Sequence, residues 1–308
     1  MSIHHPSEAF KRKAAELGFF LCSIARAEPM DEEARRLEDW LNKGYHGKMG
    51  YMANHFDLRT DPTRLVPGAR TVISLGYNYH NPDRPADPEA PRVSQYAWGE
   101  DYHNVVRRKL KELFRWIKET YGDIQGRVFV DSGPVLERDW ARRSGMGWVG
   151  KHTLLIHRDH GSYFFLAELI IDLPIEPDLP IKDYCGTCTR CIDACPTDAI
   201  APSGYLLDAS KCISYLTIEL REVIPEAFQG KLENWAFGCD ICQEVCPWNR
   251  FAQRHDEPAF EPHPDLAGMT RADWVEMTEE TFSTVFGHTP VKRAGWRKVM
   301  ETITGRSG

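Results

Sequence analysis

Cys185-Gly-Thr-Cys188-Thr-Arg-Cys191-Ile-Asp-Ala-Cys195-Pro196 is the stretch that decides how this chain is organised. Its Cys-x2-Cys-x2-Cys-x3-Cys-Pro spacing is that of bacterial ferredoxins, whose cysteines hold iron-sulfur clusters. A second run, Cys239-Asp-Ile-Cys242-Gln-Glu-Val-Cys246-Pro247, repeats the later part of the first, and Cys212 stands alone between them. These eight thiols are the number that two [4Fe-4S] clusters require.

The spacing also predicts which cysteines share a cluster. Cysteines at i, i+3 and i+6 surround one cluster, while the fourth, before proline, ligates the neighbouring cluster. The first predicted ligand set is Cys185, Cys188, Cys191 and Cys246, and the second is Cys195, Cys212, Cys239 and Cys242. Structural zinc is the alternative for Cys-x-x-Cys pairs. The triple spacing and the two Cys-Pro endings favour iron and sulfur.

Length and composition exclude several classes of protein. A chain of 308 residues is too long for a ferredoxin alone, so a second, larger domain is expected. Its net charge of −7 means that an anionic partner must be bound by local basic patches. We expect a cytoplasmic protein with no membrane partner, because apolar runs of membrane-spanning length are absent and the cysteine pattern is not that of a disulfide framework. Cys22 is expected to be a core thiol.

The pattern of apolar residues predicts an α+β fold. Helical periodicity marks residues 7–17, 31–43, 101–120 and 135–144, and apolar strand-like runs mark residues 19–24, 70–77, 126–131, 153–157 and 163–171. We predict an N-terminal α/β domain over residues 1–175, a ferredoxin-like double-cubane domain over 176–254, and a C-terminal helical segment over 255–308 that packs on the core. The proline-rich segment 173–180 is the predicted linker.

One glycine motif has to be interpreted. Gly145-Met-Gly147-Trp-Val-Gly150 satisfies the G-x-G-x-x-G pattern of dinucleotide-binding proteins. That motif needs a strand before it and a helix after it, whereas here a helical segment precedes and a strand-like segment follows. We therefore interpret it as a turn whose glycines let the backbone approach a large ligand.

Several strings together resemble the epoxyqueuosine reductase family. They are Tyr45-His-Gly-Lys-Met-Gly-Tyr51, Tyr96-Ala-Trp-Gly-Glu-Asp-Tyr-His103, Gly147-Trp-Val-Gly-Lys151, Cys212-Ile-Ser-Tyr-Leu-Thr-Ile-Glu219 and Gly238-Cys-Asp-Ile-Cys-Gln-Glu-Val-Cys-Pro-Trp-Asn249. The resemblance implies an oxidoreductase that completes queuosine at the wobble position of tRNA. Electrons from an external low-potential donor would pass through two [4Fe-4S] clusters to a base-off cobalamin, which the domain at 1–175 would bind with the substrate. It also suggests a monomer.

The resemblance further implies a proton donor, Asp131, in Val128-Phe-Val-Asp131-Ser-Gly-Pro134. Such a carboxyl needs a raised pKa, through burial or nearby negative charge, to donate near neutral pH. The alternative is that Asp131 only caps the turn that follows. Tyr102, His103 and Arg138 match family positions around the modified base, although Tyr102 and His103 could also simply begin a long helix.

Five residues are the predicted cobalamin contacts. Ser214, Tyr215 and Asp240 lie beside the cysteines of the second set, and His152 and Thr153 follow the glycine turn. The Asp-x-His-x-x-Gly string that supplies a cobalt ligand in many cobalamin enzymes is absent, which agrees with a base-off cofactor. For tRNA phosphates, basic residues concentrate at Arg107, Arg108, Lys109, Lys111, Arg115 and Lys118, and again at Lys292, Arg293, Arg297 and Lys298.

Two other functions remain open from the sequence. A reductive dehalogenase-like enzyme would also need two clusters, cobalamin and a proton donor. A non-catalytic ferredoxin-type electron-transfer subunit would need the clusters alone, and neither the large N-terminal domain nor Asp131 has a purpose in it.

Overall fold

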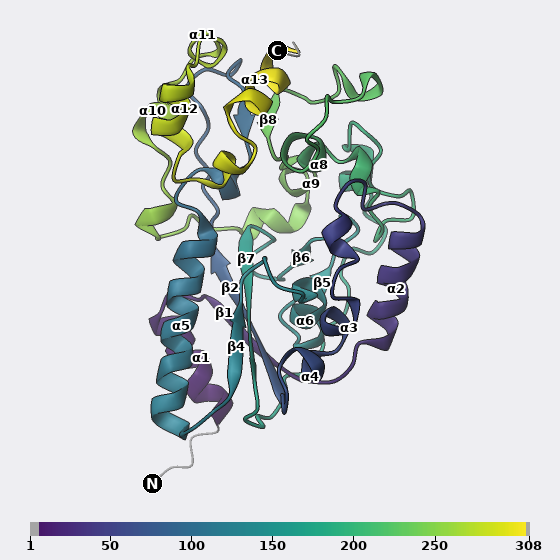
Figure 1. The fold of residues 1–308 in the computed structure, drawn as a ribbon, viewed down its shortest axis with the longest axis vertical. Coiled ribbons are helices and arrows are strands. Elements are labelled where there is room, and N and C mark those ends of the chain that lie inside the picture. Colours follow the sequence, from purple (N-terminus) through teal and green to yellow (C-terminus); the bar gives the residue numbers. More distant parts are fainter. Residues whose placement is uncertain (1–5, 306–308) are drawn as a thin grey trace.

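The computed structural model describes residues 6–305, and its centre is a four-stranded sheet (Figure 1). The strand order is β1-β2-β7-β4, with bounds Leu21–Arg26, Thr71–Asn78, Phe164–Ile171 and Gly126–Phe129. Each neighbouring pair is antiparallel. The α+β class is confirmed, and the sheet of the N-terminal part is not the parallel sheet of a wound α/β domain.

In residues 6–305, thirteen helices and four short strands complete the regular structure apart from 3-10 turns. The helices before the cysteine region are Pro6–Glu16 (α1), Asp31–Asn42 (α2), Phe56–Thr60 (α3), Pro62–Leu65 (α4), Tyr102–Tyr121 (α5) and Glu137–Arg143 (α6). Those that follow are Arg190–Asp193 (α7), Ile213–Ile218 (α8), Ile241–Glu244 (α9), Pro264–Gly268 (α10), Arg271–Val275 (α11), Glu279–Phe286 (α12) and Trp296–Thr304 (α13). The minor strands are Arg92–Val93 (β3), Trp148–Val149 (β5) and Leu155–Ile156 (β6), and the three-residue β8 spans Trp235–Phe237.

Different helices cover the two faces of the sheet (Figure 1). Ile73 and Leu169 pack in one apolar cluster with residues of α1 and α5, whereas Val72 and Ile170 pack in another with residues of α6. Successive side chains of a strand point to opposite faces, so both faces of this sheet can be apolar only if both are covered. The N-terminal part is therefore a three-layer arrangement of helices, sheet and helices.

The C-terminal segment shares its core with earlier parts of the chain. Trp274, Phe286 and Val299 pack against Trp98 and Phe237. Helices α10 to α13 and strand β8 gather at the upper end of the molecule in Figure 1. This segment consequently supports the region around residues 90–98, which leads directly into α5.

Most predicted elements are present. The helices expected at 31–43, 101–120 and 135–144 correspond to α2, α5 and α6, and the strands expected at 70–77 and 163–171 correspond to β2 and β7. The strand expected at 153–157 is reduced to β6, which forms a two-stranded hairpin with β5. Cys22 on β1 packs against the core, and burial raises the pKa of its thiol.

The glycine motif follows α6 and leads into the β5–β6 hairpin, so the expected context is confirmed. At two of these glycines the chain's own backbone occupies the space beside the turn, and the large ligand stays a prediction. A Cβ at Gly145 would lie 2.1 Å from the Leu179 carbonyl oxygen, and one at Gly147 would lie 2.3 Å from that of Ile156. These glycines permit close packing of the hairpin and of the segment after β7.

The proline-rich segment 173–180 carries no helix or strand, but it is anchored to the sheet. Thr71 donates from its hydroxyl to the Leu173 carbonyl at 2.6 Å. Asp178 accepts from Lys11 Nζ at 2.7 Å and from the Ile24 N–H at 3.0 Å. The approach to the cysteine region is therefore held in place at two points.

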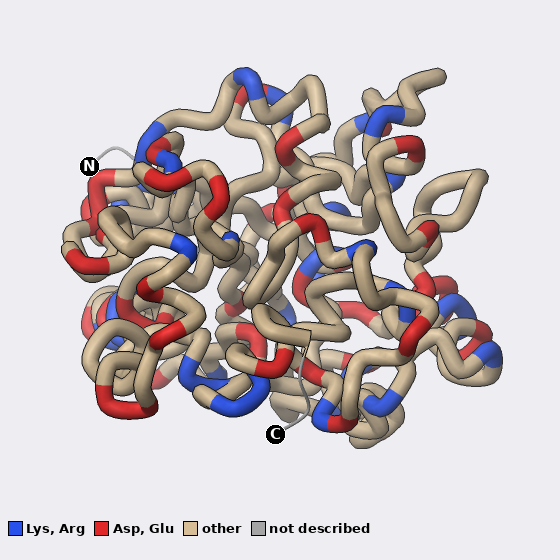
Figure 2. The backbone as a smooth tube through the Cα atoms, turned by 90° about the horizontal axis from the view of Figure 1, so that it is seen from above, with Lys and Arg blue, Asp and Glu red and all other residues tan. Residues whose placement is uncertain are grey.

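Within the described part of the chain, none of the helices combines the length and the apolar character that crossing a bilayer demands. Basic and acidic residues are interspersed over the molecule, as Figure 2 shows from above.

A buried carboxyl lies inside the sheet. Glu168 on β7 is 0% exposed, on the face toward α6, and in residues 6–305 neither of its carboxyl oxygens has a hydrogen-bond partner. Burial, followed by the neighbouring Glu137, raises the pKa of Glu168 well above its usual value. Burial and the charge of Asp131 likewise raise the pKa of Glu137. We infer that the Glu137–Glu168 pair carries at least one proton near neutral pH.

This pair predicts a pH-dependent stability. Above its ordinary value of 4.5 the unfolded Glu168 loses its proton while the folded one keeps it, so wild-type stability falls as pH rises toward the raised pKa. We expect Glu168→Gln, which cannot ionise, to gain stability relative to wild type between pH 5 and pH 8. Melting temperatures at the two pH values measure this. If the melting temperatures of the variant and wild type differ by the same amount at pH 5 and pH 8, Glu168 is ionised in the folded protein.

Candidate active site and thiol groups

The cysteines of the two runs are held on two similar short helices. Helix α7 contains Cys191 and helix α9 contains Cys242, and the residues that end them, Ala194 and Val245, have the same backbone angles, φ −86° and ψ −8°. The two helices contact each other. The internal repeat in the sequence is thus also a repeat in structure.

Four cysteines meet around one cavity, and we call them the first thiol group. A cavity of about 180 Å³ is lined by Cys185, Cys188, Cys191 and Cys246. Burial raises the pKa of Cys191 to about 11, and the charges of the other three add to the rise. These are the four cysteines that the spacing places together.

The other four are also neighbours, and we call Cys195, Cys212, Cys239 and Cys242 the second thiol group. Burial raises the pKa of Cys239, and Cys212 and Cys195 contribute through their charges. Burial likewise raises the pKa of Cys242 well above its usual value, with Cys239 and Cys212 as the next causes and Cys191 of the first group as a weaker one. The two groups therefore lie side by side.

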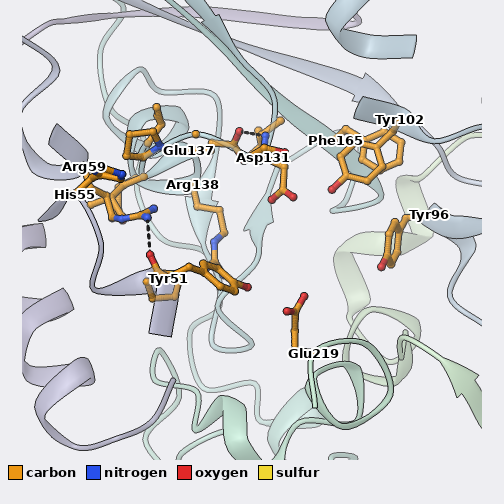
Figure 3. Close-up of a pocket in the computed structure, with 18 of the residues that line it drawn as sticks. Tyr51, His55, Arg59, Tyr96, Tyr102, Asp131, Glu137, Arg138, Phe165 and Glu219 are labelled. Carbon is orange, nitrogen blue, oxygen red and sulfur yellow. Dashed lines mark hydrogen bonds between the residues drawn. The ribbon is translucent and has the colours of Figure 1, made fainter. Parts of the chain in front are cut away.

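A separate space, which we call the main cavity, has a volume of about 830 Å³. Its walls come from residues 51–59, 131–139 and 164–166, together with Tyr79, Tyr96, Tyr102, Glu219 and Arg293. Figure 3 shows the carboxylate of Asp131 directed into this space, with Tyr102 stacked on Phe165 at one side and Tyr51 and Arg138 across from it.

Two tyrosines separate the main cavity from the second thiol group. The Tyr79 hydroxyl accepts from Gln243 Nε2 at 3.5 Å, one residue after Cys242. The ring of Tyr96 packs on Gly238, where a Cβ would lie 3.6 Å from it, one residue before Cys239. A cofactor in the main cavity would therefore lie close to the second group and farther from the first.

Asp131 follows β4 and has a left-handed backbone, with φ 55°. Its N–H donates to Glu137 at 2.6 Å, and its carboxylate hydrogen-bonds His103 Nε2 at 3.1 Å. The carboxylate is 53% exposed because it faces the main cavity. The carboxylate bonds His103 rather than the backbone of the turn, so the capping alternative lacks support.

His103 lies between two carboxylates. Asp101 caps the start of α5 by accepting from the His103 N–H at 2.9 Å, and the same carboxylate contacts His103 Nδ1 at 2.7 Å. Burial lowers the pKa of His103, but its bonds and charge interactions with Asp101 and Asp131 outweigh this and raise it to about 9. Tyr102 and His103 do begin a long helix, and their rings also reach the site.

The pKa expected for Asp131 is wrong in direction. Burial raises the pKa of its carboxyl, but the hydrogen bond and charge of His103, with smaller contributions from Tyr102 and Arg293, lower it below its usual value. In the Asp131–His103 pair the proton consequently resides on the imidazole at neutral pH.

The remaining predicted residues lie in different places. Arg138 lines the main cavity and donates from its guanidinium to the Thr153 carbonyl at 2.5 Å. None of the five predicted cobalamin contacts, His152, Thr153, Ser214, Tyr215 and Asp240, is among the lining residues of the main cavity. His152 instead lines the small cavity of the first thiol group, and burial lowers its pKa to about 4. Asp240 is buried and accepts from the Gln95 N–H at 2.9 Å.

Three of the basic residues expected to meet phosphates are engaged within the chain. Lys109 forms an ion pair with Glu257 at 3.1 Å. Arg293 lines the main cavity and forms an ion pair with Glu219 at 2.8 Å, and Lys298 is buried and donates to the Glu222 carbonyl at 2.9 Å. On α5, Arg108, Lys111, Arg115 and Lys118 are exposed.

The sequence reasoning missed several wall residues. Tyr51, His55, Arg59 and Glu219 line the main cavity. Tyr51 and Glu219 are the last residues of two of the strings that resemble the family. Nothing in the sequence showed that these two residues face the same cavity.

Comparison with known proteins agrees with this arrangement. The family model described as epoxyqueuosine reductase QueG, DUF1730, matches residues 59–132, and that of a 4Fe-4S double cluster binding domain matches residues 184–249. An epoxyqueuosine reductase of Cyclobacterium marinum is 56% identical over 305 residues, which cover 98% of this chain and 97% of that protein. One of Synechocystis is 47% identical, over 79% of this chain and 87% of the relative.

Solved structures show the same fold. The crystal structure of an epoxyqueuosine reductase with an epoxyqueuosine-modified tRNA-Tyr stem loop superposes with a TM-score of 0.87 at 32% identity, covering 96% of this chain and 79% of the other. The enzyme from Streptococcus thermophilus gives a TM-score of 0.87 at 30% identity, covering 98% and 80%. The chain described here belongs to the epoxyqueuosine reductase family.

Proposed function

We propose that this protein reduces epoxyqueuosine to queuosine at the wobble position of tRNA, the last step of queuosine biosynthesis. One observation carries the proposal: Asp131, bonded to His103, faces a cavity of about 830 Å³ whose other side adjoins the second thiol group. A source of electrons and a source of protons thus meet at one space. The identity to curated epoxyqueuosine reductases supports the same activity.

The reaction removes one oxygen atom. The epoxide takes up two electrons and two protons, and leaves an alkene and water. The chain must therefore conduct electrons, hold a group that can pass them to carbon, and supply protons where oxygen departs.

For the electrons, we propose that Cys185, Cys188, Cys191 and Cys246 ligate one [4Fe-4S] cluster and that Cys195, Cys212, Cys239 and Cys242 ligate the other. The first four thiols line one cavity of about 180 Å³, and the triple spacing with two Cys-Pro endings favours a cluster over zinc. The Trp148 Nε1–H contacts Cys185 Sγ at 3.5 Å, a kind of bond that influences cluster potential.

For the group that passes electrons to carbon, we propose that the main cavity holds cobalamin, whose low-valent cobalt supplies the reducing chemistry when bound. Tyr79 and Tyr96 would then lie between it and the second thiol group. Because the five predicted contacts are not in this wall, residues 51–59, 131–139 and 164–166 are the better candidates to hold it. The base-off form of the cobalamin stays a prediction. His55 also lines this cavity, and it is the histidine to consider when the cobalt ligands are determined.

For the proton, we propose that Asp131 faces the departing oxygen and that His103 holds the proton behind it. Asp131 alone, with its lowered pKa, would be a poor acid at neutral pH. The imidazolium, with a pKa of about 9, keeps a proton in the pair and can return it to Asp131 across 3.1 Å. Tyr102 offers an aromatic surface and Arg138 a cation to the modified base.

The other candidate functions explain less of the molecule. A non-catalytic electron-transfer subunit would need neither the main cavity nor the Asp131–His103 pair. A reductive dehalogenase-like enzyme would share the cofactors, but the curated relatives at high identity are epoxyqueuosine reductases. We further propose an external low-potential donor, a cytoplasmic location, which suits free thiols, and a monomeric state.

The proposed acid is tested by Asp131→Asn. We expect turnover to fall by about a hundredfold or more, because general acid catalysis contributes about 10²–10⁴ in rate. Iron, sulfide and cobalamin contents should stay at the wild-type level, with about eight iron atoms for two clusters. The measurement is anaerobic conversion of tRNA carrying epoxyqueuosine, followed by mass spectrometry of its nucleosides.

Asp123→Asn, an exposed acid outside the main cavity, is the matched control and should react like wild type. If Asp131→Asn keeps the wild-type rate, the assigned role of Asp131 is wrong. If fully loaded wild-type protein leaves epoxyqueuosine unchanged, the proposed function itself is wrong.

The proton-holding role of His103 predicts a pH limit. Turnover should fall as pH rises through about 9, because the pair then loses its proton. Asp101→Asn removes one of the two carboxylates that raise the His103 pKa, so this limb should move down by about one pH unit. Asparagine still caps α5, so folding should be retained. The measurement is the ratio of the variant's rate to the wild-type rate at each pH, because this ratio cancels the pH dependence of the reductant. A ratio that stays constant with pH would contradict the proton-holding role of His103.

A further inference from the structure

The surface around the first thiol group is unusually rich in exposed apolar side chains. Eight large hydrophobic residues are exposed in the described part of the chain. Five of them belong to the segments that surround this group: Leu179, Ile181, Tyr184, Tyr205 and Phe251. Exposed apolar patches mark interaction sites.

Three aromatic rings form the centre of this surface. Tyr184, 41% exposed, lies 6.0 Å from Trp248, and Trp248 lies 6.1 Å from Phe251, measured between ring centroids. Tyr184 and Trp248 also line the cavity of the first thiol group. We call these three residues the aromatic rim. It separates the proposed first cluster from solvent.

Arginines lie on and beside the rim. The Arg158 guanidinium is 5.7 Å from the Tyr184 ring, and that of Arg250 is 4.4 Å from the Phe251 ring. Arg190 is exposed in the adjoining groove of about 830 Å³. Among residues 6–305, none of these three arginines forms an ion pair. Of the two acids in the groove, Glu244 pairs with Arg92 and Asp193 accepts from the Thr189 hydroxyl. The rim therefore offers unpaired positive charge on a chain of net charge −7.

The rim is separate from the substrate site. No residue lines both the main cavity and the cavity of the first thiol group. Since the second group adjoins the main cavity, electrons must enter at the first group, which is the group that the rim covers.

Resting on the proposed function, we infer that the aromatic rim with Arg158, Arg190 and Arg250 is the docking surface for a small, acidic, one-electron carrier protein. Aromatic residues and arginine are the residues that interfaces favour, and opposite charge speeds encounter. Each encounter oxidises the carrier by one electron and reduces the chain by one. Two encounters supply the two electrons that one epoxide consumes.

The test uses cluster-loaded protein and a purified acidic flavodoxin in its hydroquinone state as the probe. Arg158→Glu/Arg190→Glu should weaken flavodoxin binding at least tenfold at low salt and slow cluster reduction in stopped flow to a similar extent. Turnover with dithionite, which needs no docking, should stay unchanged. Arg12→Glu/Arg35→Glu, with the same charge change on exposed α1 and α2 positions, is the control and should bind like wild type.

Each outcome decides the inference. If Arg158→Glu/Arg190→Glu binds flavodoxin as tightly as wild type does, the inference is wrong. It is also wrong if this variant keeps its affinity for flavodoxin but loses affinity for a tRNA anticodon stem loop, because the rim would then be an RNA-binding surface. If that variant does not load with iron, the salt dependence of wild-type binding provides the test. The dissociation constant of the complex between wild-type protein and flavodoxin should rise with salt concentration, and a constant value would overturn the inference. Failure of wild-type dithionite turnover would count against the proposed function and leave the binding result standing.

Discussion

Eight thiols gathered in two adjoining groups are the constraint on which the rest of this structure depends. A buried thiol resists ionisation, and burial raises the pKa of Cys191, Cys239 and Cys242 here. Only a bound metal compensates for four thiolates brought together, so metal binding and folding of this region are linked. Because Cys195 and Cys246 each belong to the group built mainly by the other run, both runs must be in place before either site is complete. That crossing joins α7 and α9 and fixes the wall of the main cavity behind them.

The electrostatics of the main cavity follow from how its carboxyl groups are held. Asp131 is kept ionised by His103, while burial favours the protonated form of Glu137 and Glu168 directly behind it. Of these three carboxyl groups, only Asp131 therefore presents a negative charge to the cavity, and it has a proton next to it. A left-handed backbone at Asp131, held by the bond from its N–H to Glu137, directs that carboxylate into the cavity. The residues behind the acid therefore matter for its position as well as its charge.

Much of the fold and of the thiol groups could be predicted from the amino-acid sequence alone. Long elements such as α5 and β7 have clear periodicity, and the cysteine spacing grouped the thiols as the structure places them. The failures have a common physical origin. Arg293 and Glu219 reach the main cavity from segments far from Asp131 in sequence. The expected cobalamin contacts were chosen for their nearness in sequence to the ligands, yet a side chain such as Asp240 turns away to satisfy buried backbone donors.

By itself the sequence determined the thiol groups and the α+β class through spacing and period. Its resemblance to a known family indicated the family and Asp131 as the acid to examine. Those features are local, because a cluster needs ligands at set separations and a helix or strand needs a set period. Tertiary structure alone decided the protonation of the acid, the buried Glu137–Glu168 pair, the walls of the main cavity and the separation of the rim from it. These depend on distances between residues remote in the chain, and charges and burial act through space rather than along the backbone.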